Sequence, residues 1–313
     1  MNTIKFSKIQ NKTTEQHNLE LSEVQTQDVF RQKLQIYTPC NVNIFVTEIC
    51  QNNCAFCINR KTNENVNMRY LTDDEYINGL HILFDELDCK NYEATITGGE
   101  PTLDTFKFIK TIQLCKQYGV KCRTVSTTGI NLMQTFNKKP ICQYMIENGF
   151  IHNINISRMH YDELKNAEIF NGKNISNDDI KRLALFFKMN DAEMRISCNL
   201  IKGYIDDAEK MINFVNYYRN LGVETIMFRE LEKCKCNVVD LTDIINEKLK
   251  TFKYVKTLHG MIYDVDVYIY KDMIVKHYKT LKDINKEIIY SLSYKNGFIK
   301  NGFTGDKLNV KLT

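Results

Sequence analysis

Three cysteines lie within eight residues of one another, in the stretch TEICQNNCAFC from Thr47 to Cys57. Their spacing is Cys50-x3-Cys54-x2-Cys57, and no fourth cysteine follows at a similar short distance. Thiolate metal sites usually have four ligands. Three thiolates can hold three irons of a four-iron cluster and leave the fourth iron with an open position, as a chemically active metal centre requires.

Two other interpretations of the triplet remain open from spacing alone. A zinc site would need a distant fourth ligand, such as Cys40 or His160. An electron-carrying cluster would need a remote cysteine. We expect most of the other eight cysteines to be small buried apolar residues, because the chain shows no disulfide-framework pattern; they are Cys40, Cys89, Cys115, Cys122, Cys142, Cys198, Cys234 and Cys236.

A second motif, Thr97-Gly-Gly-Glu-Pro101, follows one strand and helix later. Two glycines remove side chains where a ligand could approach the backbone closely. The neighbouring carboxylate of Glu100 can accept hydrogen bonds from an ammonium group. Alone, the motif also fits a tight turn with a capping acid; after the cysteine triplet it indicates a cofactor site.

Together the two motifs resemble those of the radical S-adenosylmethionine superfamily. The Thr-acid-x-Cys lead-in at Thr47 resembles the branch around molybdenum cofactor biosynthesis protein A. The resemblance covers about residues 41–232, and its further matches are Ser126-Thr-Thr-Gly129, Arg195-Ile-Ser-Cys-Asn199-Leu-Ile-Lys-Gly203 and Phe228-Arg229-Glu230-Leu231. Thr128 stands where the family usually has asparagine.

The resemblance implies an α/β fold, a partial (β/α)6 TIM-like barrel, with one 4Fe-4S cluster bound by Cys50, Cys54 and Cys57. S-adenosylmethionine would chelate the open iron, and one electron from the reduced cluster would cleave it to a 5′-deoxyadenosyl radical that takes hydrogen from a substrate. Such a centre is oxygen-sensitive, and it needs an electron donor such as flavodoxin or ferredoxin.

The same resemblance implies roles for residues at the strand ends. The cofactor contacts would be Phe56, Gly98, Gly99, Glu100, Ser126, Thr128, Ser157 and Asn199, with Gly98 to Glu100 holding the methionyl ammonium. Phe56 could instead shield the cluster, and Ser126 and Thr128 could be ordinary strand-end caps.

Candidates for catalytic work follow on the later strands. Arg229 and Glu230 are adjacent on a strand, so only one of them can point inward. An inward Arg229 would grip a carboxylate or phosphate, whereas an inward Glu230 would bind a cationic group. Cys198 is a candidate hydrogen donor or a core residue. Arg158 and His160 follow the fourth strand and could face the barrel mouth.

The elements that must position these residues alternate along the chain. Short β-branched runs separated by stretches of helical period are typical of βα units and a parallel sheet. The predicted strands are 42–46, 93–97, 121–127, 152–157, 193–200 and 224–230; the predicted helices lie near 73–88, 104–118, 131–147, 178–190 and 206–221. Thr72 to Glu75 fits a capping box, and Asn148-Gly149 and Leu221-Gly222 fit helix stops.

The pattern changes on either side of this region. Residues 1–40 are polar, and we expect an irregular extension there; the barrel would span 41–232. Residues 233–313 would form a C-terminal subdomain, a helix and a small antiparallel sheet, since 262–270 alternates strictly, 273–278 follows a turn, and 288–294 meets the hairpin signal at 295–297.

Composition limits the partners. The net charge is +4, from 42 Lys+Arg and 38 Asp+Glu, which gives no argument for nucleic acid. We find no apolar run near the roughly 18 residues of a membrane span and no secretory h-region. We therefore expect a cytoplasmic protein that contacts neither membrane nor nucleic acid.

The substrate is left open by the sequence. Only Cys234 and Cys236 follow the barrel, which argues against the second cluster of the molybdenum-cofactor branch. A small molecule or nucleotide, as in viperin-like members, is one interpretation. A maturase of a ribosomally made peptide, docking on the C-terminal sheet edge, is another. A non-catalytic iron–sulfur or zinc module is the third.

Overall fold

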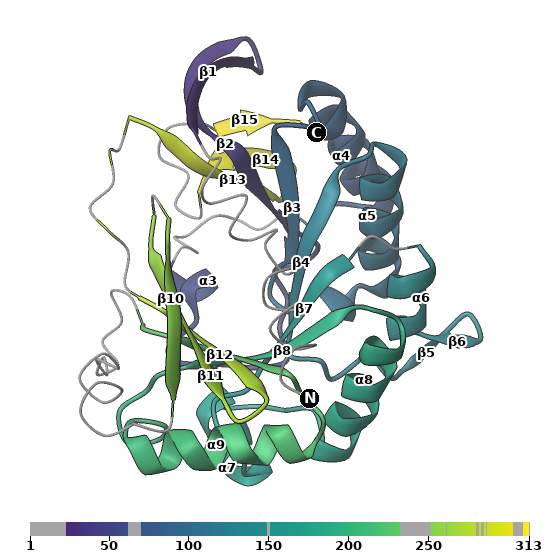
Figure 1. The fold of residues 1–313 in the computed structure, drawn as a ribbon. Helices are drawn as coiled ribbons and strands as arrows, with labels where there is room; N and C mark the ends of the chain where they lie inside the picture. The colour runs from purple at the N-terminus through teal and green to yellow at the C-terminus, as the bar shows by residue number, and fades with distance from the viewer. Residues whose placement is uncertain are drawn as a thin grey trace.

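Six parallel strands form the centre of one curved sheet, in the order in which they occur along the chain (Figure 1). All six were predicted, and each pairs in parallel with the next. They are β2 (Gln32–Phe45), β3 (Tyr92–Thr97), β4 (Lys121–Thr127), β7 (Ile151–Ser157), β8 (Glu193–Asn199) and β9 (Thr225–Arg229). The mixed α/β fold with a large parallel sheet is therefore confirmed.

The structure is a computed structural model. It describes residues 23–61, 70–148, 151–231, 252–260, 262–279 and 287–302, together with 282, 285 and 309–312. Cys234 and Cys236 and the predicted C-terminal helix lie outside these residues.

Helices cover the convex side of the sheet (Figure 1). They are α4 (Asp73–Glu86), α5 (Thr105–Gln117), α6 (Ile141–Glu147), α8 (Asn177–Met189) and α9 (Ala208–Asn220). The predicted capping box of α4 is present, because the side chains of Thr72 and Glu75 each accept from the other's backbone N–H. The predicted stops of α6 and α9 are also confirmed, at Asn148 and Leu221.

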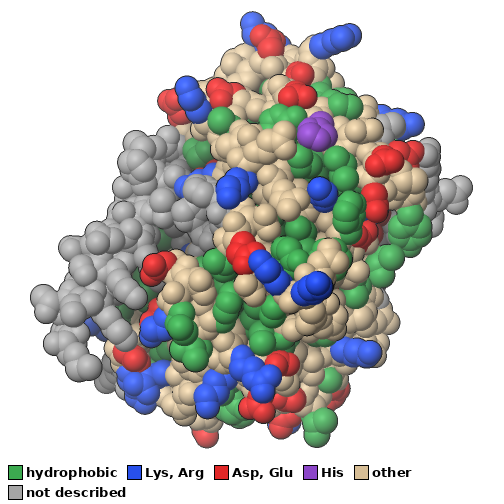
Figure 2. All heavy atoms as spheres, turned by 90° about the vertical axis from the view of Figure 1, so that its right-hand side faces the viewer, with side chains coloured by type: hydrophobic (Ala, Val, Ile, Leu, Met, Phe, Trp, Pro, Cys, Tyr) green, Lys and Arg blue, Asp and Glu red, His purple; other side chains and the backbone are tan. Residues whose placement is uncertain are grey.

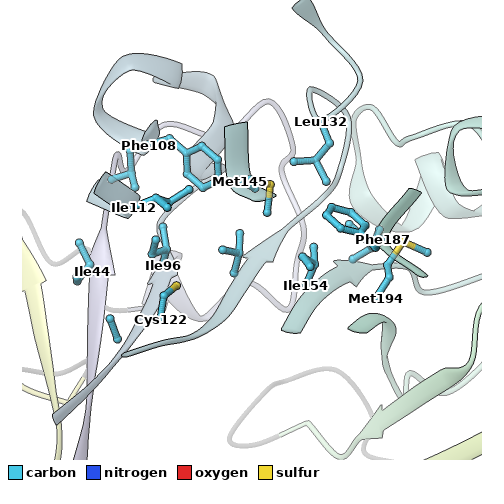
Figure 3. Packing of buried hydrophobic residues seen from close by; sticks show 14 of the residues in the cluster. Ile44, Ile96, Phe108, Ile112, Cys122, Leu132, Met145, Ile154, Phe187 and Met194 are labelled. Atoms are coloured by element: carbon cyan, nitrogen blue, oxygen red, sulfur yellow. The ribbon is translucent and has the colours of Figure 1, made fainter. Parts of the chain in front are cut away.

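The main core lies between the sheet and these helices. Figure 3 shows Ile96 and Ile154 of the strands facing Phe108 and Ile112 of α5 and Phe187 of α8. Since side chains alternate along a strand, the residues between these apolar ones point to the concave side of the sheet.

The start of one predicted helix was wrong. Residues 131–140 do not begin a helix; they form turns and a small hairpin of β5 (Thr135–Phe136) and β6 (Lys139–Pro140). Asn137 and Lys138 have positive φ at its turn, and Pro140 precedes α6 as its N-cap. Two short helices were not predicted, α3 (Ile58–Lys61) and α7 (Glu163–Phe170).

The C-terminal strands extend both edges of the central sheet and do not form a sheet of their own in the described ranges. The predicted hairpins exist, but β12 pairs in parallel with β9, and β13 pairs in parallel with β2. The strands are β10 (Lys253–His259), β11 (Asp264–Tyr270), β12 (Met273–Tyr278), β13 (Ile289–Lys295), β14 (Phe298–Asn301) and β15 (Asn309–Lys311). Along this sheet β12, the six central strands and β13 all run parallel.

The N-terminal segment is more regular than predicted. Residues 23–40 form β1 (Glu23–Val29) and the first part of β2, which pair as an antiparallel hairpin. Phe30 and Arg31 make its turn with positive φ. The low hydrophobicity of this segment hid the strands, because the hairpin is exposed at its tip.

The helical side of the molecule has no single-sign charge field. Figure 2 shows acidic and basic side chains interspersed with apolar ones on this side, where no basic footprint for nucleic acid is visible. Among the helices that the structure describes, none is long and apolar enough to cross a bilayer.

Candidate active site

The cysteine loop leaves the carboxyl end of β2. Cys50, Cys54 and Cys57 are all partly exposed, and none is in a disulfide. The backbone N–H of Asn52 donates to Sγ of Cys50 at 3.4 Å, and the N–H of Cys57 donates to the carbonyl of Cys54 at 3.2 Å. Hydrogen bonds to a ligating sulfur stabilise the thiolate form and tune a cluster.

One side of the loop rests on the Gly-Gly pair at the end of β3. The N–H of Gly99 donates to the carbonyl of Thr47 at 2.7 Å, and that of Glu100 to the carbonyl of Ile49 at 2.8 Å. A Cβ on Gly98 would collide with the Thr47 carbonyl oxygen, and one on Gly99 would lie 2.5 Å from the carbonyl carbon of Ile49. The glycines therefore admit the cysteine loop itself, a role that the sequence did not suggest.

A second side of the loop rests on the end of α7. The N–H of Asn53 donates to the carbonyl of Phe170 at 2.9 Å, and the N–H of Lys173 donates to Oδ1 of Asn52 at 2.7 Å. Gly172 lies between them, where a Cβ would come within 2.9 Å of the Asn52 Cα. The unpredicted helix α7 thus helps to fix the loop.

A third contact comes from the turn between β13 and β14. Nζ of Lys295 lies 2.5 Å from Oε1 of Glu48, and Nδ2 of Asn296 donates to Oε2 of the same carboxylate at 2.5 Å. Both ion-pair side chains are at most 10% exposed. Lys295 also lies 5.3 Å from the ring centre of Phe45. The C-terminal hairpin therefore holds the residue two positions before Cys50.

Removing this buried cation should weaken the fold. We expect Lys295→Met to lower the free energy of unfolding by about 3 kcal/mol. The buried carboxylate of Glu48 would keep its charge but lose its cation, and of the two contacts only the one with Asn296 would remain. Glu48→Gln with Lys295→Met should recover most of the loss. Urea denaturation of both single variants and the double variant measures the coupling energy between Lys295 and Glu48. A coupling energy below about 0.5 kcal/mol would show that this ion pair does not stabilise the fold.

Phe56 packs within a small apolar cluster beside the loop. Its ring centre lies 6.5 Å from that of Phe170, and together with Cys54 it contacts the cluster of Met159, Ile169, Phe170, Ile201 and Leu231. These contacts favour the shielding role over an adenine contact.

Glu100 is fully buried and bound on both oxygens. Oε1 accepts from the hydroxyls of Thr102 at 2.6 Å and Thr127 at 2.5 Å. Oε2 accepts from the N–H of Thr128 at 2.6 Å and from its hydroxyl at 2.7 Å. Gln51 of the cysteine loop donates to the Thr128 hydroxyl at 3.0 Å. The structure brings Glu100 and Thr128 together, with the threonines as the partners of the carboxylate.

The other predicted cofactor contacts lie on the concave face or its rim. Ser126 lies opposite Asn155 in the strand register, and Ser157 lies opposite Ser197. Asn199 lies opposite Arg229 at the carboxyl end. Ser126, Ser157 and Asn199 are all partly exposed, so they remain accessible to a ligand on this face.

Of the adjacent residues Arg229 and Glu230 at the carboxyl end of β9, Arg229 is the inward one. Phe228 packs on Phe214 of α9, which places Arg229 on the opposite, concave face. The Arg229 guanidinium lies 4.0 Å from the ring centre of Tyr278. Glu230 does not share this position, because its Oε1 lies 2.8 Å from Nε2 of the fully buried His277.

Cys198 is not on the concave face. It is fully buried in the core between sheet and helices, and burial raises the pKa of its thiol well above the ordinary value. The hydrogen-donor role is therefore corrected to core packing.

Arg158 and His160 do not face the barrel mouth. Arg158 is fully buried and donates to Tyr218, Asn174, Ile175 and Asn177. His160 is buried beside Tyr161, accepts the N–H of Asp162, and has a pKa that burial lowers.

Thiol alkylation should separate the two groups of cysteines. In the cluster-free protein at pH 8, we expect iodoacetamide to modify Cys50, Cys54 and Cys57 and to leave Cys198 and Cys115 intact, because burial raises the pKa of both buried thiols far above that pH. Peptide mapping by mass spectrometry checks this. Early modification of Cys198 would show that it is not a core residue.

A family comparison identifies the chain. The family model described as the radical SAM superfamily matches residues 44–215, more than half of the 313 residues. The matched segment contains the cysteine loop, the Gly-Gly pair and α7. The chain belongs to the radical SAM superfamily. It is an enzyme, and its cofactors are a 4Fe-4S cluster and S-adenosylmethionine.

The chain is similar to several solved structures. SuiB from Streptococcus suis bound to S-adenosylmethionine is 20% identical, with a TM-score of 0.50 over 68% of this chain and 48% of SuiB. anSMEcpe with bound AdoMet is 17% identical, with a TM-score of 0.43 over 60% of this chain and 49% of that chain. TsrM from Kitasatospora setae with cobalamin and a [4Fe-4S] cluster is 13% identical, with a TM-score of 0.39 over 60% of this chain and 34% of that chain.

This radical SAM chain spans about half the length of SuiB. No curated protein matches it significantly.

The three thiolates of the loop fit a cluster in which each binds a different iron. In the ranges that the structure describes, no three His, Cys, Asp or Glu side chains converge where they could hold a single ion. Each cysteine of a three-thiolate cluster site binds a different iron, so convergence on one point is not required. Cys40 lies at the opposite end of the β2–β3 ladder, paired with Tyr92, and cannot complete a zinc site at the loop.

Proposed function

We propose that this radical SAM enzyme abstracts hydrogen from a small polar molecule bound on the concave face of its sheet. The observation that carries this proposal is the chemistry of that face. In an ordinary barrel the interior is filled by Val, Ile and Leu, whereas here the inward positions of β7 and β8 are Asn153, Asn155, Ser157, Glu193, Arg195, Ser197 and Asn199. Most of them are partly exposed, so solvent reaches them.

Hydrogen-bonding side chains continue around the face. Nδ2 of Asn41 donates to Oδ1 of Asn43 at 3.0 Å, and the hydroxyl of Thr95 donates to Oδ1 of Asn41 at 2.7 Å. Buried polar side chains are unfavourable unless they have partners. A face of this kind suits a polar ligand, and a lipid-like substrate would leave it unsatisfied.

The predicted residues of the cysteine loop, the Gly-Gly pair and the rim have the following roles in this proposal. Cys50, Cys54 and Cys57 hold the cluster, and Gly98 to Glu100 flank the methionyl end of S-adenosylmethionine. When bound by these cysteines, a reduced cluster would supply the electron for reductive cleavage of S-adenosylmethionine. Arg229, stacked on Tyr278 at the rim, offers a planar guanidinium to an anionic group of the substrate or cofactor.

A peptide maturase has less support. In the C-terminal strand region that the structure describes, Tyr268, Tyr270 and Tyr278 are buried, whereas Tyr263 and Lys276 are partly exposed. This proposal does not include the chemistry of the molybdenum-cofactor branch. That chemistry uses a second cluster, and we propose one cluster for this enzyme. The electron donor is proposed to be a flavodoxin or ferredoxin.

The test is anaerobic turnover. The protein is reconstituted with iron and sulfide, given S-adenosylmethionine and a reductant, and assayed for 5′-deoxyadenosine by mass spectrometry. A small-molecule extract that raises this product contains the substrate, and loss of the increase in Arg229→Met, with cluster content unchanged, supports the anion role. Stimulation by peptides and not by small molecules would overturn the substrate assignment.

A further inference from the structure

Asn155, on the concave face, has a hydrogen-bonding atom that the described part of the fold does not use. Asn155 lies on β7 between Ile154 and Ile156, both fully buried in the helix-facing core. Its side chain therefore points to the concave face. It lies opposite Ser126 on one neighbouring strand and opposite Arg195 on the other.

Oδ1 of Asn155 is buried and accepts no hydrogen bond from any residue that the structure describes, and the residue as a whole is only 8% exposed. Asn43 makes the contrast on the same face: it is 6% exposed, and its Nδ2 donates to the carbonyl of Leu292 at 3.2 Å while its Oδ1 accepts from Asn41. A buried acceptor without a donor destabilises a fold. Its presence in the middle of a sheet is explained if a ligand supplies the donor.

The charges around Asn155 restrict that ligand. Arg195 is paired with Glu193 at 2.7 Å, and the Thr225 hydroxyl donates to the other oxygen of the same carboxylate at 2.7 Å. The cation beside Asn155 is thus neutralised within the sheet. A carboxylate or phosphate here would face both the amide oxygen and the Glu193 carboxylate, whereas an N–H or O–H group would meet an acceptor.

We propose that Asn155 is a substrate-binding residue whose Oδ1 accepts a hydrogen bond from a neutral amide or hydroxyl group at the inner end of the substrate. This inference rests on the proposed function, since it takes the concave face as the substrate site. It divides the site by depth: a neutral donor group lies at Asn155, and any anionic group lies at the rim with Arg229.

Two probes of the same shape test this in the reconstituted full-length protein. Trifluoroacetamide carries an N–H donor, and trifluoroacetate replaces it by a charged oxygen. Fluorine NMR line broadening measures the binding of each. We expect trifluoroacetamide to bind and trifluoroacetate to bind more weakly, and we expect Asn155→Leu to weaken trifluoroacetamide binding by about fivefold, the effect of one lost hydrogen bond.

Asn155→Asp keeps an acceptor oxygen of the same shape and should retain trifluoroacetamide binding. Equal binding of this probe to the wild-type protein and Asn155→Leu would overturn the proposal, and so would tighter binding of trifluoroacetate or no binding of either probe. The measurement needs no radical chemistry. A failure of 5′-deoxyadenosine formation would therefore count against the proposed function, and a failure here against Asn155 alone.

Stability provides an independent readout. Because Oδ1 of Asn155 has no donor among the described residues, Asn155→Leu should leave the Tm of the ligand-free protein unchanged or higher. Asn43→Leu, on the same face, removes two made hydrogen bonds and should lower the Tm by several degrees. An equal loss in both variants would show that Asn155 is a structural residue.

Discussion

Cys54→Ala is expected to abolish the radical chemistry. Removing a residue that only hydrogen-bonds to a metal ligand typically lowers metal affinity or activity 10- to 100-fold. Cys54→Ala removes a ligand itself. We therefore expect 5′-deoxyadenosine formation to fall at least about 100-fold. Iron content and visible absorbance after anaerobic reconstitution should fall with it, while circular dichroism stays close to that of the wild type.

Cys89→Ala is the matched control for this change. Cys89 is also partly buried, but it follows α4 and lies outside the cysteine loop. Its removal should leave both iron content and product formation close to the wild-type values. Retention of a full cluster by Cys54→Ala would contradict the three-cysteine assignment, as would its loss from Cys89→Ala.

Gly99→Ala is expected to destabilise the fold strongly, because the added methyl group would collide with backbone atoms. The new Cβ would lie 2.5 Å from the carbonyl carbon of Ile49 and 2.6 Å from the carbonyl oxygen of Glu48. Backbone atoms cannot yield as a flexible side chain can, so the cysteine loop must move and the Glu100–Ile49 hydrogen bond is lost. We expect a loss of about 3 kcal/mol in unfolding free energy and poor cluster retention.

Gly203→Ala separates this collision from ordinary backbone strain. Gly203 has φ +94° and no atom within 4 Å of an added Cβ, so only the left-handed conformation is penalised, by about 1–2 kcal/mol. Thermal and urea unfolding of both variants gives the comparison. A Gly99→Ala protein as stable as Gly203→Ala would show that the loop does not need this close approach.

The central strands and the cluster ligands were predictable because their signals are local. Short β-branched runs that alternate with helical stretches predicted all six strands. The spacing of Cys50, Cys54 and Cys57 predicted a thiolate centre. The concave face was also predictable, because polar residues stand at every second position of 153–157 and 193–199. Asn155 and Arg195 were not predicted as site residues, because they lie within the strands and belong to none of the motifs at the strand ends.

What the sequence did not predict depends on distant pairing. The parallel pairing of β13 with β2 joins segments far apart in sequence, and no local pattern encodes which edge a strand will join. The Lys295–Glu48 pair has the same origin. The sequence predicted that something approaches the backbone closely at the Gly-Gly pair. It could not predict that this is the backbone of Thr47 and Ile49, because a glycine does not specify which group lies against it.

The pairing of β13 beside β2 has a consequence for the order of assembly. The contact between Glu48 and Asn296 spans 248 residues, and that between Asn43 and Leu292 spans 249. Loops of this length close late, since their entropy must be lost before the contacts form. On the ribosome, the cysteines would emerge long before the hairpin that holds their loop. Iron loading is therefore expected to follow synthesis of the C-terminal strands, and nascent chains ending before residue 289 should bind iron weakly.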